Sequence, residues 1–103
     1  MTLGDFRATL SEPEPPSGVS AALAALWHDA RGDWDAAHRT AQDIEDPNGA
    51  WVHAYLHRKE GDTGNAGYWY RRAGKPMASM SLEAEWNAIA TALLMARTDD
   101  RES

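Results

Sequence analysis

The stretch HAYLHRKEGD, residues 53–62, has the residue types and spacing of a metal or acid–base site on a helix. His53 and His57 are four residues apart and Glu60 follows three residues later, so a helix places all three side chains on one face. Two histidines at this spacing can ligate one zinc ion, with Glu60 or His38 as a third ligand. The sequence lacks the glutamate that directly follows the first histidine in zinc-protease helices. A metal site formed by His53, His57 and Glu60 is therefore one hypothesis.

The same histidines also fit a structural interpretation, in which they are buried at a helix–helix contact. Buried imidazoles need hydrogen-bond partners. Three acidic residues can supply them: Glu60, Asp29 and Asp33. Acid–base catalysis by His38, His53 and His57 is a further alternative, but the sequence has no cysteine, no Gly-rich phosphate loop and no recognisable nucleophile turn. We therefore predict no catalytic residues and no cofactor, and we favour a non-enzymatic function.

A second candidate site combines aromatic and cationic side chains. Of the five tryptophans, Trp27, Trp34 and Trp86 lie on apolar helical stripes and are predicted core residues. Residues 51–76 carry a formal charge of +3 in a chain of net charge −6, and aromatic residues beside arginines are typical of protein interfaces. We predict a groove for a protein or peptide with an acidic segment or a C-terminal carboxylate. Its residues are Trp51, Tyr55, Arg58, Tyr68 and Arg72. The alternative is that these side chains pack beneath neighbouring segments.

The composition limits the class of protein. A chain of 103 residues is long enough for one domain with one core. The lack of cysteine excludes disulfides, a thiol nucleophile and zinc–thiolate clusters. The net charge of −6 argues against general nucleic-acid binding. No apolar run reaches the ~18 residues of a membrane span and no signal peptide is recognised, so we expect no membrane partner and a cytoplasmic location.

The pattern of caps, prolines and apolar stripes predicts an all-α chain in three parts. Residues 1–16 form a short N-terminal helix, capped by Thr2, and a stiff Pro-rich spacer. Residues 17–97 form a helical-repeat-like domain, and residues 98–103 form a polar tail. The last helix of the domain is capped by Ser81, and its apolar face runs from Leu82 to Leu94.

Two Gly-Asp turns divide the domain into pairs of helices. The first helix is predicted from Ser17 to about residue 31, where Gly32-Asp33 ends it and caps the second helix. The third helix begins at Asp46-Pro47, with proline at the first helical position. It ends at Gly61-Asp62, which caps a fourth helix that stops near residue 74. No segment alternates polar and apolar residues for long enough to predict a strand.

The two pairs of helices repeat with an offset of 29 residues, and the second pair carries small, aromatic and proline residues at regular positions. These residues are Ala54, Ala66, Tyr70, Ala73 and Pro76. The pattern resembles the tetratricopeptide repeat, although the usual period is ~34 residues and Ala41 replaces the aromatic residue in the first pair. The resemblance implies close helix crossings lined by alanine. It also implies that His53 and His57 face the partner helix, while the groove residues of this helix are Trp51, Tyr55 and Arg58.

Longer motifs resemble a family of small bacterial proteins of unassigned function. The matching segments are MTLGDFR, LWHDARGDWDAAH, GAWVHAYLHRKEGDTGNAGYWYRRAGKP and EAEW, which together extend over nearly the whole chain. The resemblance implies one helical domain and carries no activity with it. The family usually has tryptophan at the position of His28, which implies that His28 is neither a ligand nor a catalyst.

Together, these patterns predict an all-α fold of two tetratricopeptide-like helical hairpins, an N-terminal helical arm and a C-terminal capping helix. The predicted function is protein or peptide binding by a groove on the second repeat. The competing hypothesis is a small-molecule or metal-binding protein, including a hydrolase, that uses His53, His57 and Glu60. A third alternative is a homo-oligomeric structural protein with no external ligand. The last helix would then seal a homodimer instead of capping its own chain.

Overall fold

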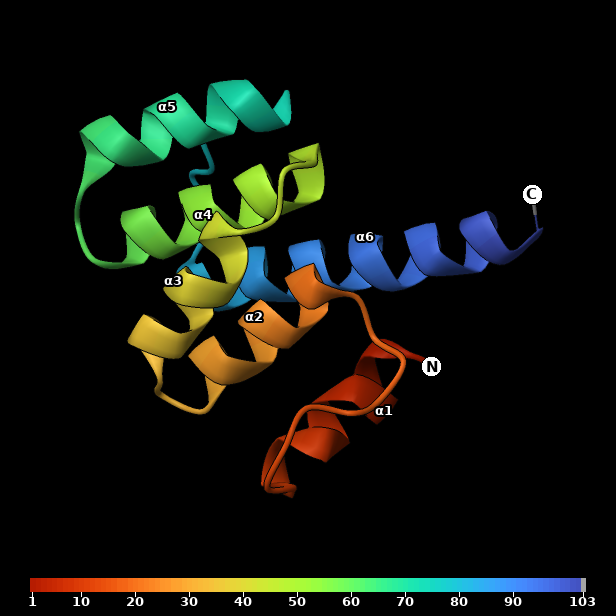
Figure 1. Cartoon of the computed structure of the whole chain (residues 1–103). Coiled ribbons are helices and arrows are strands. Elements are labelled where there is room, and N and C mark those ends of the chain that lie inside the picture. Colours follow the sequence, from red (N-terminus) through yellow and green to blue (C-terminus); the bar gives the residue numbers. More distant parts are fainter. Residues whose placement is uncertain (103) are drawn as a thin grey trace.

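The computed structural model contains helices as the only regular elements among the residues that it describes (Figure 1). It describes the backbone of residues 1–102 and the side chains of residues 1–96. The elements are α1 (Leu3–Ala8), the 3₁₀ turn η1 (Thr9–Ser11), α2 (Ala21–Ala30), α3 (Trp34–Gln42), α4 (Pro47–Lys59), α5 (Thr63–Ala73) and α6 (Leu82–Glu102). The predicted all-α fold is confirmed. The predicted polar tail, residues 98–103, lies outside the residues whose side chains are described.

Side-chain caps start most of the helices where the sequence pattern places them. Thr2 and Asp5 form a reciprocal capping box at α1, in which each side chain accepts the backbone N–H of the other residue at 3.1 Å. Asp46 caps α4 and precedes Pro47 at the first helical position. Ser81 accepts the N–H of Ala84 at the start of α6. Among the described residues, no helix has the length and apolar character needed to cross a membrane.

The start of α2 differs from the prediction. The helix begins at Ala21 rather than at Ser17, and its N-cap is Ser20, whose hydroxyl oxygen accepts the N–H of Leu23 at 3.2 Å. Gly18 has a φ of +84°, which a right-handed helix cannot contain. Both serines are suitable caps by residue type. The left-handed glycine between them therefore decides which serine starts the helix.

The turns at Gly32-Asp33 and Gly61-Asp62 have the same backbone conformation, as the 29-residue offset predicts. The two glycines have φ values of +83° and +88°, and the two aspartates have ψ values of 76° and 77°. Each aspartate donates its N–H to the carbonyl oxygen five residues earlier and accepts, through its carboxylate, the N–H three residues later. Each turn joins two packed helices, so α2–α3 and α4–α5 form helical hairpins.

Small side chains allow the second hairpin to close tightly. Ala54 of α4 packs with Ala66 and Tyr70 of α5 in a cluster that is shielded from solvent. Alanine at a helix crossing allows the two axes to approach, and the tyrosine ring fills the space beside it. The predicted alanine-lined crossing is therefore present in this hairpin.

Helix α6 and the N-terminal arm cover the two hairpins. In Figure 1, α6 passes across α2 and α4, and Ile89, Ala90 and Leu93 on its inner face are buried in the main core. Phe6 of α1 stacks on Trp86 of α6, with ring centroids 5.9 Å apart. These contacts establish the predicted roles of α6 as the capping helix and of α1 as an arm packed against it.

Candidate metal centre

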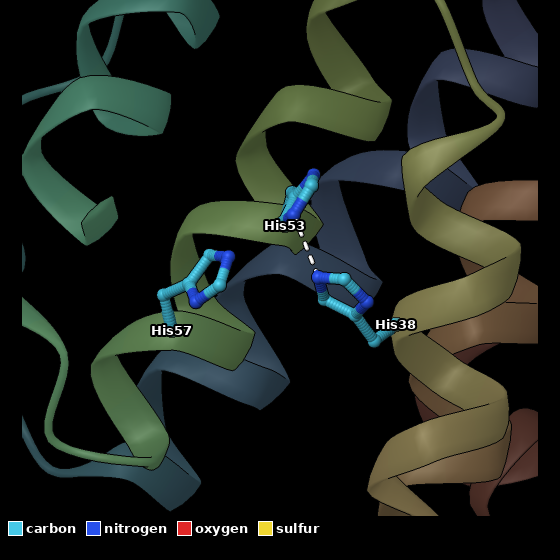
Figure 2. Close-up of side chains that lie close together, drawn as sticks. All are labelled: His38, His53 and His57. Atoms are coloured by element: carbon cyan, nitrogen blue, oxygen red, sulfur yellow. Dashed lines mark hydrogen bonds between the residues drawn. The ribbon is translucent and has the colours of Figure 1, made fainter.

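Three histidines from two helices converge between the hairpins. His38 of α3 faces His53 and His57 of α4 (Figure 2), and one ligand nitrogen from each of the three lies within 4.8 Å of the others. Nε2 of His38 and Nε2 of His53 are 3.0 Å apart and share a hydrogen bond. We call these three residues the histidine cluster.

The helices position the cluster through sequence spacing and a tryptophan contact. The four-residue spacing in α4 stacks the His53 and His57 rings at a centroid distance of 4.8 Å. In α3, Trp34 precedes His38 by four residues, and its ring stacks on the imidazole at 4.9 Å. The Trp34 Nε1–H donates to the carbonyl oxygen of Leu56 at 3.0 Å, which ties α3 to α4 beside the cluster. Trp69 of α5 stacks on the His53 ring at 4.0 Å.

The surroundings of His38 and His53 favour their neutral imidazole forms, because they lower the pKa of both rings. The His53 residue is only 5% exposed, and burial together with the imidazoles of His38 and His57 lowers its pKa from 6.5 to about 4. Burial and the neighbouring His57 also lower the pKa of His38. The short contact between His38 and His53 requires one ring to carry a proton on Nε2 and the other to accept it. Neutral imidazole is the form that ligates a metal ion.

Glu60 has a different position from the one that the metal hypothesis assigned to it. Its Oε1 lies 2.9 Å from Nδ1 of His57, so it contacts one nitrogen of that ring. A carboxylate on Nδ1 orients the ring and leaves Nε2 as the metal-binding nitrogen. The structure thus combines His53 and His57 with His38, and it places Glu60 behind His57 as an orienting group.

The geometry fits an ion with imidazole ligands after a small adjustment. Two nitrogens bound to a tetrahedral zinc ion at its usual bond length lie about 3.3 Å apart, close to the 3.0 Å between His38 and His53. An imidazole ligates through a lone pair in its own ring plane. The His53 and His57 rings are stacked at an interplanar angle of 21°, so one of them must tilt for both to bind the same ion. Binding would also replace the hydrogen bond between His38 and His53.

The five residues predicted to line a groove are not gathered on one surface. Tyr55 is 3% exposed, and its hydroxyl donates to Oδ2 of Asp29 at 3.0 Å. Arg58 donates to Oε1 of Glu85 at 2.9 Å and to the carbonyl oxygen of Met80. Both side chains therefore make structural contacts that hold α4 to its neighbours.

The remaining three groove residues lie on or near α5. Tyr68 is 45% exposed, and the guanidinium of Arg72 lies over its ring at 5.7 Å and donates to its hydroxyl oxygen at 3.1 Å. Arg72 also lies 5.3 Å from the centre of the Trp69 ring. Trp51 is half-buried, and the ammonium of Lys75 lies 4.2 Å from its ring centre. The structure therefore brings Tyr68 and Arg72 together and places Trp51 beside a different cation.

Two tryptophans that sandwich the cluster were not predicted as site residues. The contact of Trp34 with His38 could have been predicted from their four-residue spacing in one helix. The contact of Trp69 with His53 could not, because it depends on the packing of α5 on α4. No protein-family model, no curated protein and no solved structure matches this chain.

Proposed function

We propose that the protein binds one divalent transition-metal ion through His38, His53 and His57. The observation that carries this proposal is the convergence of three imidazoles from α3 and α4, with their ligand nitrogens within 4.8 Å of one another. Imidazole ligands suit Zn²⁺, Cu²⁺ and Ni²⁺. The lowered pKa of His53 supports it, because a neutral imidazole is the form that ligates a metal. The carboxylate behind His57 supports it in another way, because it contacts Nδ1 and leaves Nε2 of that ring for an ion.

The expected consequence of binding is a link between the two hairpins. His38 belongs to the α2–α3 hairpin, whereas His53 and His57 belong to the α4–α5 hairpin. An ion bound by all three side chains joins helices from both units and stabilises the folded chain, because the unfolded chain does not hold the three ligands together. The proposed function is therefore metal binding with a structural effect.

The test is metal stoichiometry in protein purified without a histidine tag. We expect one Zn²⁺ per chain by equilibrium dialysis and elemental analysis, and we expect Co²⁺ to give the visible absorption of a site with imidazole ligands. The variant His38→Gln should lose at least tenfold in affinity, because even the loss of a group that only orients a ligand typically costs 10–100-fold. His28→Gln is the matched control, because His28 lies outside the cluster and contacts Trp27. Equal binding by the two variants, or stoichiometry far below one, would show the proposal to be wrong.

A second candidate function is contact with an acidic protein or peptide through Tyr68 and Arg72. The specific observation is the exposed Tyr68 ring beneath the Arg72 guanidinium, with Arg71 exposed one residue before it. Arginine beside an exposed aromatic ring is a common interface anchor. Arg72→Ala should weaken binding of an acidic peptide, whereas replacement of an exposed arginine elsewhere, Arg39→Ala in α3, should not. A cytoplasmic location, a homodimer and the absence of nucleic-acid partners remain predictions from the sequence.

A further inference from the structure

A cavity lies apart from the histidine cluster, between the N-terminal arm, α2, α4 and α6. Its volume is about 430 Å³, within the usual range for small-molecule sites. Neither metal binding nor the Tyr68–Arg72 contact uses it. Its wall includes one charged group from each of four helices, α1, α2, α4 and α6, together with apolar side chains.

A buried polar group forms one side of this cavity. The Asp29 residue is only 2% exposed. Its Oδ2 accepts the Tyr55 hydroxyl at 3.0 Å, and its Oδ1 accepts the Lys59 ammonium at 2.9 Å. Both carboxylate oxygens therefore have partners, and Lys59 is held at the cavity by an ion pair in which only the carboxylate is buried.

Apolar side chains form another part of the cavity lining. Trp86 of α6 donates its Nε1–H to the carbonyl oxygen of Leu26 at 3.0 Å, and its ring stacks on Phe6. Leu10 of the arm and Leu82 of α6 also line the cavity. A hydrocarbon chain or ring would lose contact with water against this wall.

The two cations at the cavity, Lys59 and Arg7, have N–H groups beyond those that Asp29 and Asn87 accept. The Lys59 ammonium has three N–H groups, of which Asp29 takes one. The Arg7 guanidinium has five N–H groups, and it donates to Oδ1 of Asn87 at 2.9 Å. Glu83 is the other carboxylate at the cavity. Because the oxygens of Asp29 are already engaged, an incoming anion finds donors on Lys59 and Arg7.

From this arrangement, we propose that the cavity binds a small amphipathic carboxylate. The carboxylate of the ligand accepts hydrogen bonds from Lys59 and Arg7, and its apolar part packs against Trp86, Leu10 and Leu82. Charge-assisted hydrogen bonds supply the preference for an anion, and burial of the apolar part supplies most of the affinity. This site is independent of the proposed metal site.

The first experiment uses octanoate as the probe, with octanol and octylamine as matched compounds that differ only in the head group. In ¹H–¹⁵N spectra, octanoate should shift the indole N–H signal of Trp86 and the backbone signal of Asn87. The indole signal of Trp34, beside the histidine cluster, should stay unchanged and serves as the internal control. Zn²⁺ should shift the Trp34 indole signal and leave the Trp86 indole signal unchanged. The metal-site proposal and the carboxylate-site proposal can therefore fail separately.

The second experiment replaces the two cations one at a time. Lys59→Gln retains a donor for Asp29 and should weaken octanoate binding about fivefold, and Arg7→Gln should do the same from an exposed position that does not affect the core. Lys75→Gln, whose cation lies over Trp51, is the control and should bind like the wild type. If Lys59→Gln fails to fold, the octanoate affinity of Arg7→Gln tests the proposal instead. Equal binding of octanol, preferred binding of octylamine, or no shift of Trp86 with millimolar octanoate would overturn the proposal.

Discussion

The ion pair between Arg58 and Glu85 allows a sharp test of whether Arg58 is structural or available to a partner. Glu85 has a side chain that is 2% exposed, and its oxygens accept from Arg58 at 2.9 Å and from the Tyr70 hydroxyl at 2.5 Å. Replacement of Arg58 by methionine keeps an unbranched apolar stem but removes the charge. Glu85 would then be a buried carboxylate whose remaining side-chain hydrogen bond, among the described residues, comes from Tyr70.

The expected loss is large relative to the stability of a domain of this size. Removal of one partner from a buried ion pair typically costs 3–5 kcal/mol. The side chain of Arg58 is 19% exposed and the Tyr70 hydrogen bond remains, so we expect about 3 kcal/mol. A chain of 103 residues has a total stability of roughly 5–15 kcal/mol. The loss should lower the melting temperature by roughly 15 °C.

The assay is urea unfolding followed by circular dichroism, with Arg58→Met, Glu85→Met and the double variant measured together. The double variant removes both charges and should lose far less than the sum of the two single losses, because an apolar pair can replace a buried ion pair at little cost. A loss of about 1–3 kcal/mol should remain, because the buried Tyr70 hydroxyl no longer has Glu85 as its acceptor. The two single changes should therefore be strongly non-additive. Additive losses, or a loss below about 1 kcal/mol for Arg58→Met, would refute the assignment of Arg58 to a buried structural network.

Three further predictions follow from the cluster and the turns. With a chelator present, the free energy of unfolding should fall by at most about 3 kcal/mol as the pH is lowered from 6.5 towards 4. The reason is that the unfolded chain protonates His53 near pH 6.5, whereas the folded chain protonates it only near pH 4. Urea titrations should show this pH dependence in the wild type and a smaller one in His53→Gln. Free Zn²⁺ at 100 times its dissociation constant should raise the free energy of unfolding by about 2.7 kcal/mol, as thermal unfolding would report. At the same zinc concentration His38→Gln should gain no more than about 1.4 kcal/mol, because its affinity is at least tenfold lower. Gly32→Ala and Gly61→Ala should each cost about 1–2 kcal/mol, since both positions have positive φ and an added Cβ meets no atom within 4 Å at either. The control is Gly64→Ala in α5, which has equal space and no positive φ, and denaturant midpoints should show it to be neutral or stabilising.

Local residue chemistry accounts for the elements that were predicted well. An aspartate after a glycine starts a helix through hydrogen bonds to N–H groups three residues away, so Gly32-Asp33 and Gly61-Asp62 could be identified without any knowledge of the fold. The predicted start of α2 at Ser17 was wrong because local capping chemistry alone could not distinguish two nearby serines. Two serines have equal capping chemistry, and the choice of Ser20 depends on the path of the chain through Gly18.

Packing between distant helices accounts for what could not be predicted. The sequence pattern places Tyr55 on a helix face, but only the position of α2 turns that face towards Asp29 and buries it. His38 was an optional third ligand because its distance from His53 depends on how α3 crosses α4. The role of Glu60 also depends on the ring orientation of His57, which spacing alone does not define.

Local sequence patterns were sufficient to predict the helices, most of their caps and the four-residue spacing of His53 and His57, because each depends on hydrogen bonds and side-chain directions within one or two turns of chain. The tertiary structure alone decided that His38 completes the cluster, that Tyr55 and Arg58 are enclosed, and that Lys59 and Arg7 line one cavity. These are contacts between residues far apart in the chain. They depend on the relative positions of whole helices, which the summed burial of many side chains establishes and no short pattern records.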